Sequence, residues 1–106
     1  MKEFPHFEFV NGWLKKEALL FTSFFRNQFI KNSQFSSLEI GVHHGKFFIG
    51  LENITPPSGK AIAIDIFDAQ EKNIDGSGAG NLRIFHGHVA NFCSNPERVV
   101  VKASDS

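Results

Sequence analysis

The sequence predicts an α/β fold in which one helix precedes a β-α-β-α-β unit. Three short stretches, 36–42, 60–65 and 98–103, have the continuous apolar character that strands need in a sheet covered on both faces. Stretches with apolar residues at helical spacing separate them. Strands joined through helices are parallel, with right-handed crossovers. The order is that of half of a doubly wound nucleotide-binding fold, a parallel sheet that ends after its third strand.

The first third of the chain is predicted to hold an arm and one amphipathic helix. Residues 3–12, EFPHFEFVNG, are aromatic and bounded by turn residues, and we interpret them as a mobile docking arm. The segment 13–31 contains no proline or glycine. Five apolar residues recur in it at helical spacing and form the expected packing face: Leu14, Ala18, Phe21, Phe25 and Phe29. We therefore divide the chain into 1–35, arm and helix, and 36–106, the partial nucleotide-binding domain.

The sheet unit begins with SSLEIGV, 36–42, a short strand that stops at Gly41. Residues 45–54 then predict a helix of two to three turns. The segment TPPSG, 55–59, is a turn, because its two prolines cannot continue the helix. KAIAID, 60–65, is the second strand and ends in a carboxylate.

The rest of the chain is predicted to supply a loop, a helix and the last strand. Residues 66–80 are polar and glycine-rich, and 81–94 have one apolar helical face interrupted by Gly87. That face consists of Leu82, Phe85, Val89 and Phe92. RVVVKA, 98–103, is the third strand. Because the first strand is central in the complete fold, an end after the third leaves an unpaired apolar edge, and we expect a fragment. That edge is a candidate for homo-oligomer formation.

Composition excludes several classes of function. Eleven basic residues balance eleven acidic ones, so the overall charge favours neither nucleic acid nor an anionic membrane. Cys93 is the only cysteine, which excludes an internal disulfide and a cysteine metal cluster and suits a reducing interior. No apolar run resembles a signal peptide or approaches the roughly 20 residues of a membrane span. We expect a soluble, cytoplasmic protein.

The candidate cofactor loop is LEIGVHHGKFF. A cofactor loop in this fold lies at the carboxyl end of the first strand, where the chain turns into a helix and the backbone must approach the ligand closely. Here Glu39 and Gly41 end the strand and Gly45 begins the helix. This context matches that requirement.

The denser glycine stretch NIDGSGAGN, 73–81, lacks this context because no strand precedes it. It imitates the start of an EF-hand calcium loop, but Gly78 stands where an apolar residue belongs and Leu82 where the bidentate glutamate belongs. We interpret it as a loop that covers the nucleoside part of the cofactor or the entrance for the second substrate, with Asn81 capping the next helix.

Asp65 is the second candidate binding residue. It closes AIAID twenty residues after Gly45, where an acidic side chain accepts hydrogen bonds from both hydroxyls of a ribose. A helix-capping or solvated aspartate is the alternative. The glycine loop at the right distance favours the ribose role.

Three segments together resemble class I S-adenosylmethionine-dependent methyltransferases: LEIGVHHGKFFIGL, AIAIDIFDAQEKNIDGSGAGN and RVVVKASDS. The nearest likeness is to bacterial members that act on small molecules or sugar-type substrates. The resemblance covers about 36–106 and implies the cofactor-binding half of that Rossmann-like fold. The family's first motif reads E/D-x-G-x-G-x-G. Glu39, Gly41 and Gly45 match it, while His43 replaces the middle glycine.

The resemblance implies a role for each matching residue at the methionine end of S-adenosylmethionine. Gly41 and its neighbours Val42, His43 and Gly45 would line the methionine moiety. Glu39 would accept hydrogen bonds there, from the cofactor ammonium or through water. The helix N-terminus near Gly45 could meet the carboxylate of the cofactor.

At the adenosine end the resemblance places four further residues. Asp65 would hold the ribose hydroxyls, with Ile66 and Phe67 beside the adenine. Asp105 would contact the adenine amino group. The acceptor and any catalytic base come from later strands in the family, so the catalytic residues stay unknown and no metal ligand is predicted.

Two alternatives remain. NAD(P) requires the fingerprint G-x-G-x-x-G, but His43 and Lys46 occupy two of the glycine positions. A non-catalytic interaction module would use the exposed sheet edge or the aromatic arm. The histidines do not distinguish these functions. His86 and His88 lie on different sides of a helix and cannot share one metal ion. His43 and His44 adjoin the loop, in a cofactor-facing or structural role.

Overall fold

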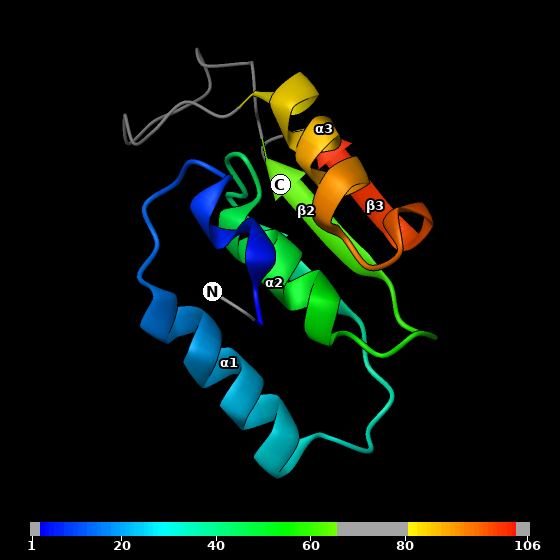
Figure 1. Cartoon of the computed structure of the whole chain (residues 1–106). Helices are drawn as coiled ribbons and strands as arrows, with labels where there is room; N and C mark the ends of the chain where they lie inside the picture. The colour runs from blue at the N-terminus through cyan, green and yellow to red at the C-terminus, as the bar shows by residue number, and fades with distance from the viewer. Residues whose placement is uncertain (1–2, 66–80, 104–106) are drawn as a thin grey trace.

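The computed structural model describes residues 3–65 and 81–103. The predicted Ile66, Phe67 and Asp105, and the glycine stretch up to residue 80, lie outside them. The elements in chain order are η1 (Pro5–Glu8), α1 (Lys16–Phe29), β1 (Ser37–Ile40), α2 (Lys46–Ile54), β2 (Ala61–Asp65), α3 (Leu82–Phe92), η3 (Pro96–Arg98) and β3 (Val99–Ala103) (Figure 1). Each predicted helix and strand is present. Asn81 caps α3 as expected, because its Oδ1 accepts a hydrogen bond of 2.9 Å from Ile84 N.

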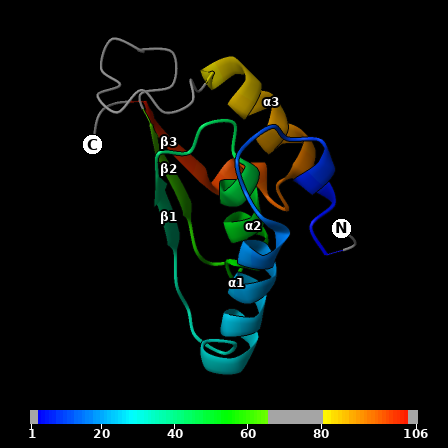
Figure 2. The same cartoon turned by 90° about the vertical axis from the view of Figure 1, so that its left-hand side faces the viewer.

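The sheet has three parallel strands in the order β1-β2-β3, which confirms the predicted α/β fold. Leu38, Ile62 and Val100 are in register across it. Both crossovers step in the same direction, so right-handed connections place α2 and α3 on the same face (Figure 2).

The opposite face of the sheet differs from the expectation. Leu38, Ile40 and Val100 are exposed there, and the described helices lie on the other side (Figure 2). A doubly wound sheet receives helices on its second face only where the strand order reverses. The strands β1 to β3 include no such reversal.

The core lies between the sheet and the helices. Ala61 and Ala63 are fully buried on β2, and their small side chains let α2 and α3 approach the sheet closely. The rings of Phe48 on α2 and Phe85 on α3 meet edge to face, with centroids 5.5 Å apart. The buried apolar residues of this core are Val10, Val42, Phe48, Ile49, Ala61, Ala63, Phe85 and Val89.

The predicted packing face of α1 is wrong. Phe21, Phe25 and Phe29 are exposed, and Leu19 is the buried residue of the helix. Leu19 packs so closely on Gly50 of α2 that a Cβ at that glycine would overlap its side chain. Two sides of this helix carry apolar residues, so periodicity alone predicted the helix but selected the wrong side to bury.

The arm is packed against its own chain, which also corrects the expectation. Phe4, His6 and Val10 are buried, and Val10 belongs to the core described above. His6 Nε2–H donates a hydrogen bond of 2.6 Å to the carbonyl of Lys46 at the start of α2. His6 is therefore part of the packing around the first turn of α2.

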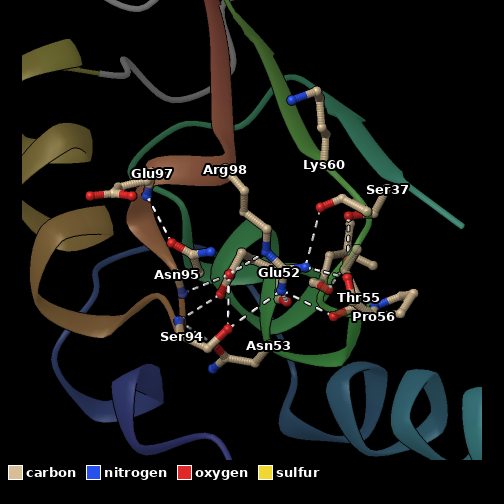
Figure 3. A network of polar contacts seen from close by, with 12 residues as sticks. Ser37, Glu52, Asn53, Thr55, Pro56, Lys60, Ser94, Asn95, Glu97 and Arg98 are labelled. Atoms are coloured by element: carbon tan, nitrogen blue, oxygen red, sulfur yellow. Dashed lines mark hydrogen bonds and ion pairs between the residues drawn. The ribbon is translucent and has the colours of Figure 1, made fainter.

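A buried ion pair joins α2 to the end of η3, just before β3 (Figure 3). Arg98 Nε lies 2.8 Å from Glu52 Oε2, and both side chains are buried. Glu52 also accepts hydrogen bonds from the backbone N–H groups of Ser94 and Asn95. Burial by itself raises the pKa of Glu52, but these bonds and Arg98 outweigh it and hold the pKa below its ordinary value.

The remaining donors of Arg98 satisfy carbonyl groups where α2 ends. Nη2 donates to the carbonyls of Glu52 and Thr55 at 2.6 and 3.0 Å. Nη1 donates to those of Pro56 and Gly59 at 2.5 and 3.3 Å (Figure 3). A helix leaves its last carbonyls without intrahelical partners. Here a guanidinium from a distant segment supplies donors, in addition to the backbone N–H of Thr55, which also donates to the carbonyl of Glu52.

Candidate cofactor site

The candidate site lies at the carboxyl ends of β1 and β2, which meet at one edge of the parallel sheet (Figure 2). β1 ends at Ile40, a loop follows over 41–45, and α2 starts at Lys46. β2 ends at Asp65. Open α/β sheets bind ligands outside the carboxyl ends of their strands.

Three residues of the loop have left-handed backbone conformations. Gly41, His43 and Gly45 have φ angles of 81°, 58° and 95°. Position 45 requires glycine for two reasons. Its φ angle is left-handed, and a Cβ there would come within 2.9 Å of the Phe85 ring. His43 is the only non-glycine residue with positive φ among the described residues. A side chain at such a position is strained, and strain of this kind concentrates at ligand sites.

Asp65 holds this loop through a hydrogen bond to its backbone. Its Oδ2 accepts a hydrogen bond of 2.6 Å from the backbone N–H of His43. A second tie comes from Gly41, whose N–H donates to the carbonyl of Ile64 at 2.8 Å. The end of β2 thus fixes the loop that follows β1, and two residues predicted for the site are in direct contact.

Glu39 places a second carboxyl group at the same edge. It pairs with Ala63, two residues before Asp65, so both acidic side chains lie on the helix-covered face. Burial, with the negative charge of Asp65 as a smaller cause, raises the pKa of Glu39 to about 8. Its Oε1 is buried without a hydrogen-bond partner. At neutral pH the neutral carboxyl is therefore favoured.

The two loop histidines are neighbours in the segment between β1 and α2. The rings of His43 and His44 are 4.0 Å apart, and both ring nitrogens of His44 are buried without hydrogen-bond partners. Burial lowers the pKa of His44, and the charges of His43 and His88 lower it further. His86 is exposed on α3, while His88 is half-buried. The described residues contain no group of three or more side chains arranged to hold a metal ion.

The first turn of α2 faces the same edge. Gly45 is its N-cap residue and provides no side-chain cap. The free backbone N–H groups of a helix start carry partial positive charge and suit a carboxylate or phosphate. Val42 contributes only backbone here, because its side chain is buried in the core and its carbonyl accepts a hydrogen bond from Gly45 N.

Some features of the site were missed in the sequence. The contact of Phe85 with Gly45 joins residues that are far apart in the chain. The charge of His88, which lowers the pKa of His44, also acts between distant residues. Only the apolar periodicity of 81–94 hinted at the first, since it placed Phe85 on the buried side of α3.

The strand, glycine loop, helix and following strand define a Rossmann-like parallel α/β fold. Comparisons of the chain with models of protein families, with curated proteins and with solved structures found no match. Among the described residues, no helix has the length and apolarity to cross a membrane.

Proposed function

We propose that this chain is the cofactor-binding half of an S-adenosylmethionine-dependent methyltransferase that acts on a small-molecule acceptor. One observation carries the proposal: the left-handed glycine loop after β1 is held by the carboxylate that ends β2. This brings the two parts of the resemblance, the first motif and the ribose-type acid, to one edge of the sheet.

The geometry supports a division of roles. The loop from Gly41 to Gly45 and the uncapped start of α2 would receive the methionine part, with the helix N-terminus toward its carboxylate. Glu39, buried with an unpartnered oxygen, would receive the ammonium group. Asp65 would accept hydrogen bonds from the ribose with the carboxylate that also holds His43 N.

Calorimetry with S-adenosylhomocysteine tests the proposal without requiring turnover. Saturable binding is expected, with NADH as the competing ligand. A folded protein that binds NADH and ignores S-adenosylhomocysteine would contradict the methyltransferase assignment and favour a dinucleotide site.

Two substitutions of Asp65 separate ligand binding from loop support. Asp65→Asn keeps an oxygen that can accept from His43 N, so the melting temperature should stay near that of the wild type. The neutral amide accepts poorly from a second hydroxyl, and affinity should fall about tenfold or more. Asp65→Ala should lower both affinity and melting temperature. Glu97→Gln, an exposed acid on η3, is the matched control and should change neither.

A non-catalytic interaction module is the second candidate. The exposed apolar face formed by Leu38, Ile40 and Val100 favours it, because an apolar surface of this kind is typical of a contact with another chain. This candidate predicts self-association that the cofactor does not alter. A monomer whose melting temperature rises with S-adenosylhomocysteine would count against it.

A further inference from the structure

The outer side of α1 carries a row of exposed aromatic side chains that the proposed cofactor site does not use. Phe21, Phe25 and Phe29 follow one another at intervals of four residues. The ring centroids of Phe21 and Phe25 are 6.4 Å apart, and those of Phe25 and Phe29 are 5.1 Å apart. Phe24 extends the row around the helix. The exposed fractions of Phe21, Phe24, Phe25 and Phe29 are 64, 54, 43 and 69%. We call these four residues the phenylalanine face.

Trp13 lies just before α1 and is 88% exposed. It is the only tryptophan of the chain. α1 packs on α2 through Leu19, and it runs along the outside of the molecule (Figure 1). The phenylalanine face is therefore directed away from the rest of the described protein, at a cost in exposed apolar surface that monomeric proteins usually avoid.

Charge around this face is not balanced, although the whole chain is neutral. Between Trp13 and Lys31 the sequence has four basic residues, Lys15, Lys16, Arg26 and Lys31, and one acidic residue, Glu17. The three lysines are exposed and lie at the two ends of the helix. Glu17 is in the first turn, where a negative charge favours the helix N-terminus.

We propose that α1 docks on the surface of an anionic lipid bilayer, with the phenylalanine face in the interfacial layer and the helix in the plane of the membrane. Aromatic rings on one side and basic residues elsewhere around the helix are the pattern of helices that lie in this layer. The lysine stems allow their ammonium groups to reach the phosphates. With 14 residues, α1 is about 21 Å long, which is too short to cross the hydrocarbon core but sufficient to lie along it.

Charge decides between a bilayer and a second copy of this chain as the occupant. Two copies that met through the phenylalanine face would bring the exposed lysines at the ends of both helices close together, and these charges would repel one another. An anionic bilayer attracts the same lysines. The basic excess thus favours the lipid surface.

Trp13 provides an intrinsic probe for this proposal. Its emission should shift to the blue when the protein meets vesicles that contain phosphatidylserine and phosphatidylcholine, and much less with phosphatidylcholine alone. Sedimentation with the vesicles should follow the same order and should weaken as salt is added.

Matched variants locate the contact. Phe25→Ser combined with Phe29→Ser should weaken vesicle binding about tenfold or more, because each ring contributes buried apolar area. Phe9→Ser removes a ring that is equally exposed but lies outside the phenylalanine face, and it should leave binding unchanged. Lys15→Gln and Lys31→Gln should each weaken binding to the anionic vesicles about fivefold.

Three results would overturn the proposal. One is a folded wild-type protein, checked by circular dichroism, that ignores anionic vesicles. Another is equal vesicle binding by the wild type and the Phe25→Ser/Phe29→Ser variant. The third is a wild-type dimer in light scattering that this variant dissociates, which would assign the phenylalanine face to a second copy.

Discussion

The carboxylate of Asp65 and the backbone N–H of His43 are joined by a hydrogen bond of 2.6 Å. The bond connects the end of β2 to the loop that leaves β1, and it holds a histidine with a φ angle of 58°. The loop conformation and the proposed ribose contact therefore depend on the same side chain.

Gly41→Ala should destabilise the protein by about 1–2 kcal/mol, because φ is 81° and a left-handed conformation is unfavourable with a Cβ. A Cβ at Gly41 would meet no atom within 4 Å, so crowding plays no part. Gly87→Ala is the matched control: its Cβ is equally unobstructed, but the residue is helical. It should stabilise by about 0.5–1 kcal/mol. Urea unfolding of both variants measures the difference; an equal effect would remove the conformational explanation.

Glu39→Gln should change how stability depends on pH. The folded pKa of about 8 lies above the ordinary value of 4.5, so the neutral form is favoured in the folded protein. The contribution of Glu39 is fully present below pH 4.5 and is lost as the pH rises through 8. The glutamine variant should therefore be more stable than the wild type at pH 9 and close to it at pH 4. Unfolding free energies at a series of pH values provide the test, and parallel curves would exclude the buried neutral carboxyl.

Glu52→Gln should destabilise the protein by about 3–5 kcal/mol, since it leaves the buried Arg98 without its negative partner. Glu97→Gln, exposed on the neighbouring η3, should cost less than about 0.5 kcal/mol. A similar cost for both would show that the ion pair contributes little.

The lowered pKa of Glu52 also has a consequence in acid. Its contribution is present above the ordinary value of 4.5 and is lost as the pH falls through the lower folded value. The stability difference between the wild type and Glu52→Gln should accordingly shrink in acid. A difference that stays constant down to the acid transition would contradict this origin.

Phe4→Ala should cost about 3–5 kcal/mol, because the ring is buried near Leu19 and Gly50. Phe9→Ala, in the same arm but 70% exposed, should cost less than about 1 kcal/mol. Thermal unfolding distinguishes the two. If neither change matters, the arm does not support α2 in solution.

The fold could be predicted well from the sequence because its signals are local. The strand 60–65 follows two prolines and ends in a carboxylate, and observed β2 begins at Ala61 and ends at Asp65. The edge shared by Gly41 and Asp65 follows from parallel topology alone.

The remaining features depend on contacts between distant residues. The side of α1 that packs is decided by the fit of Leu19 on Gly50, and burial of His6 by the carbonyl of Lys46. From the sequence, Arg98 is predicted to be the polar first residue of a strand. Its partner Glu52 lies 46 positions earlier, with no local pattern to connect them.

The carbonyl groups at the end of α2 accept hydrogen bonds from Arg98. The ribosome adds this residue 46 positions after Glu52. Until that residue is added, the chain lacks the cation that pairs with Glu52 and the guanidinium that donates to the carbonyls of Glu52 and Thr55. We therefore expect that the segment from β1 to β2 does not fold separately. We expect one cooperative transition for the entire chain, in which the third strand and the second helix form together.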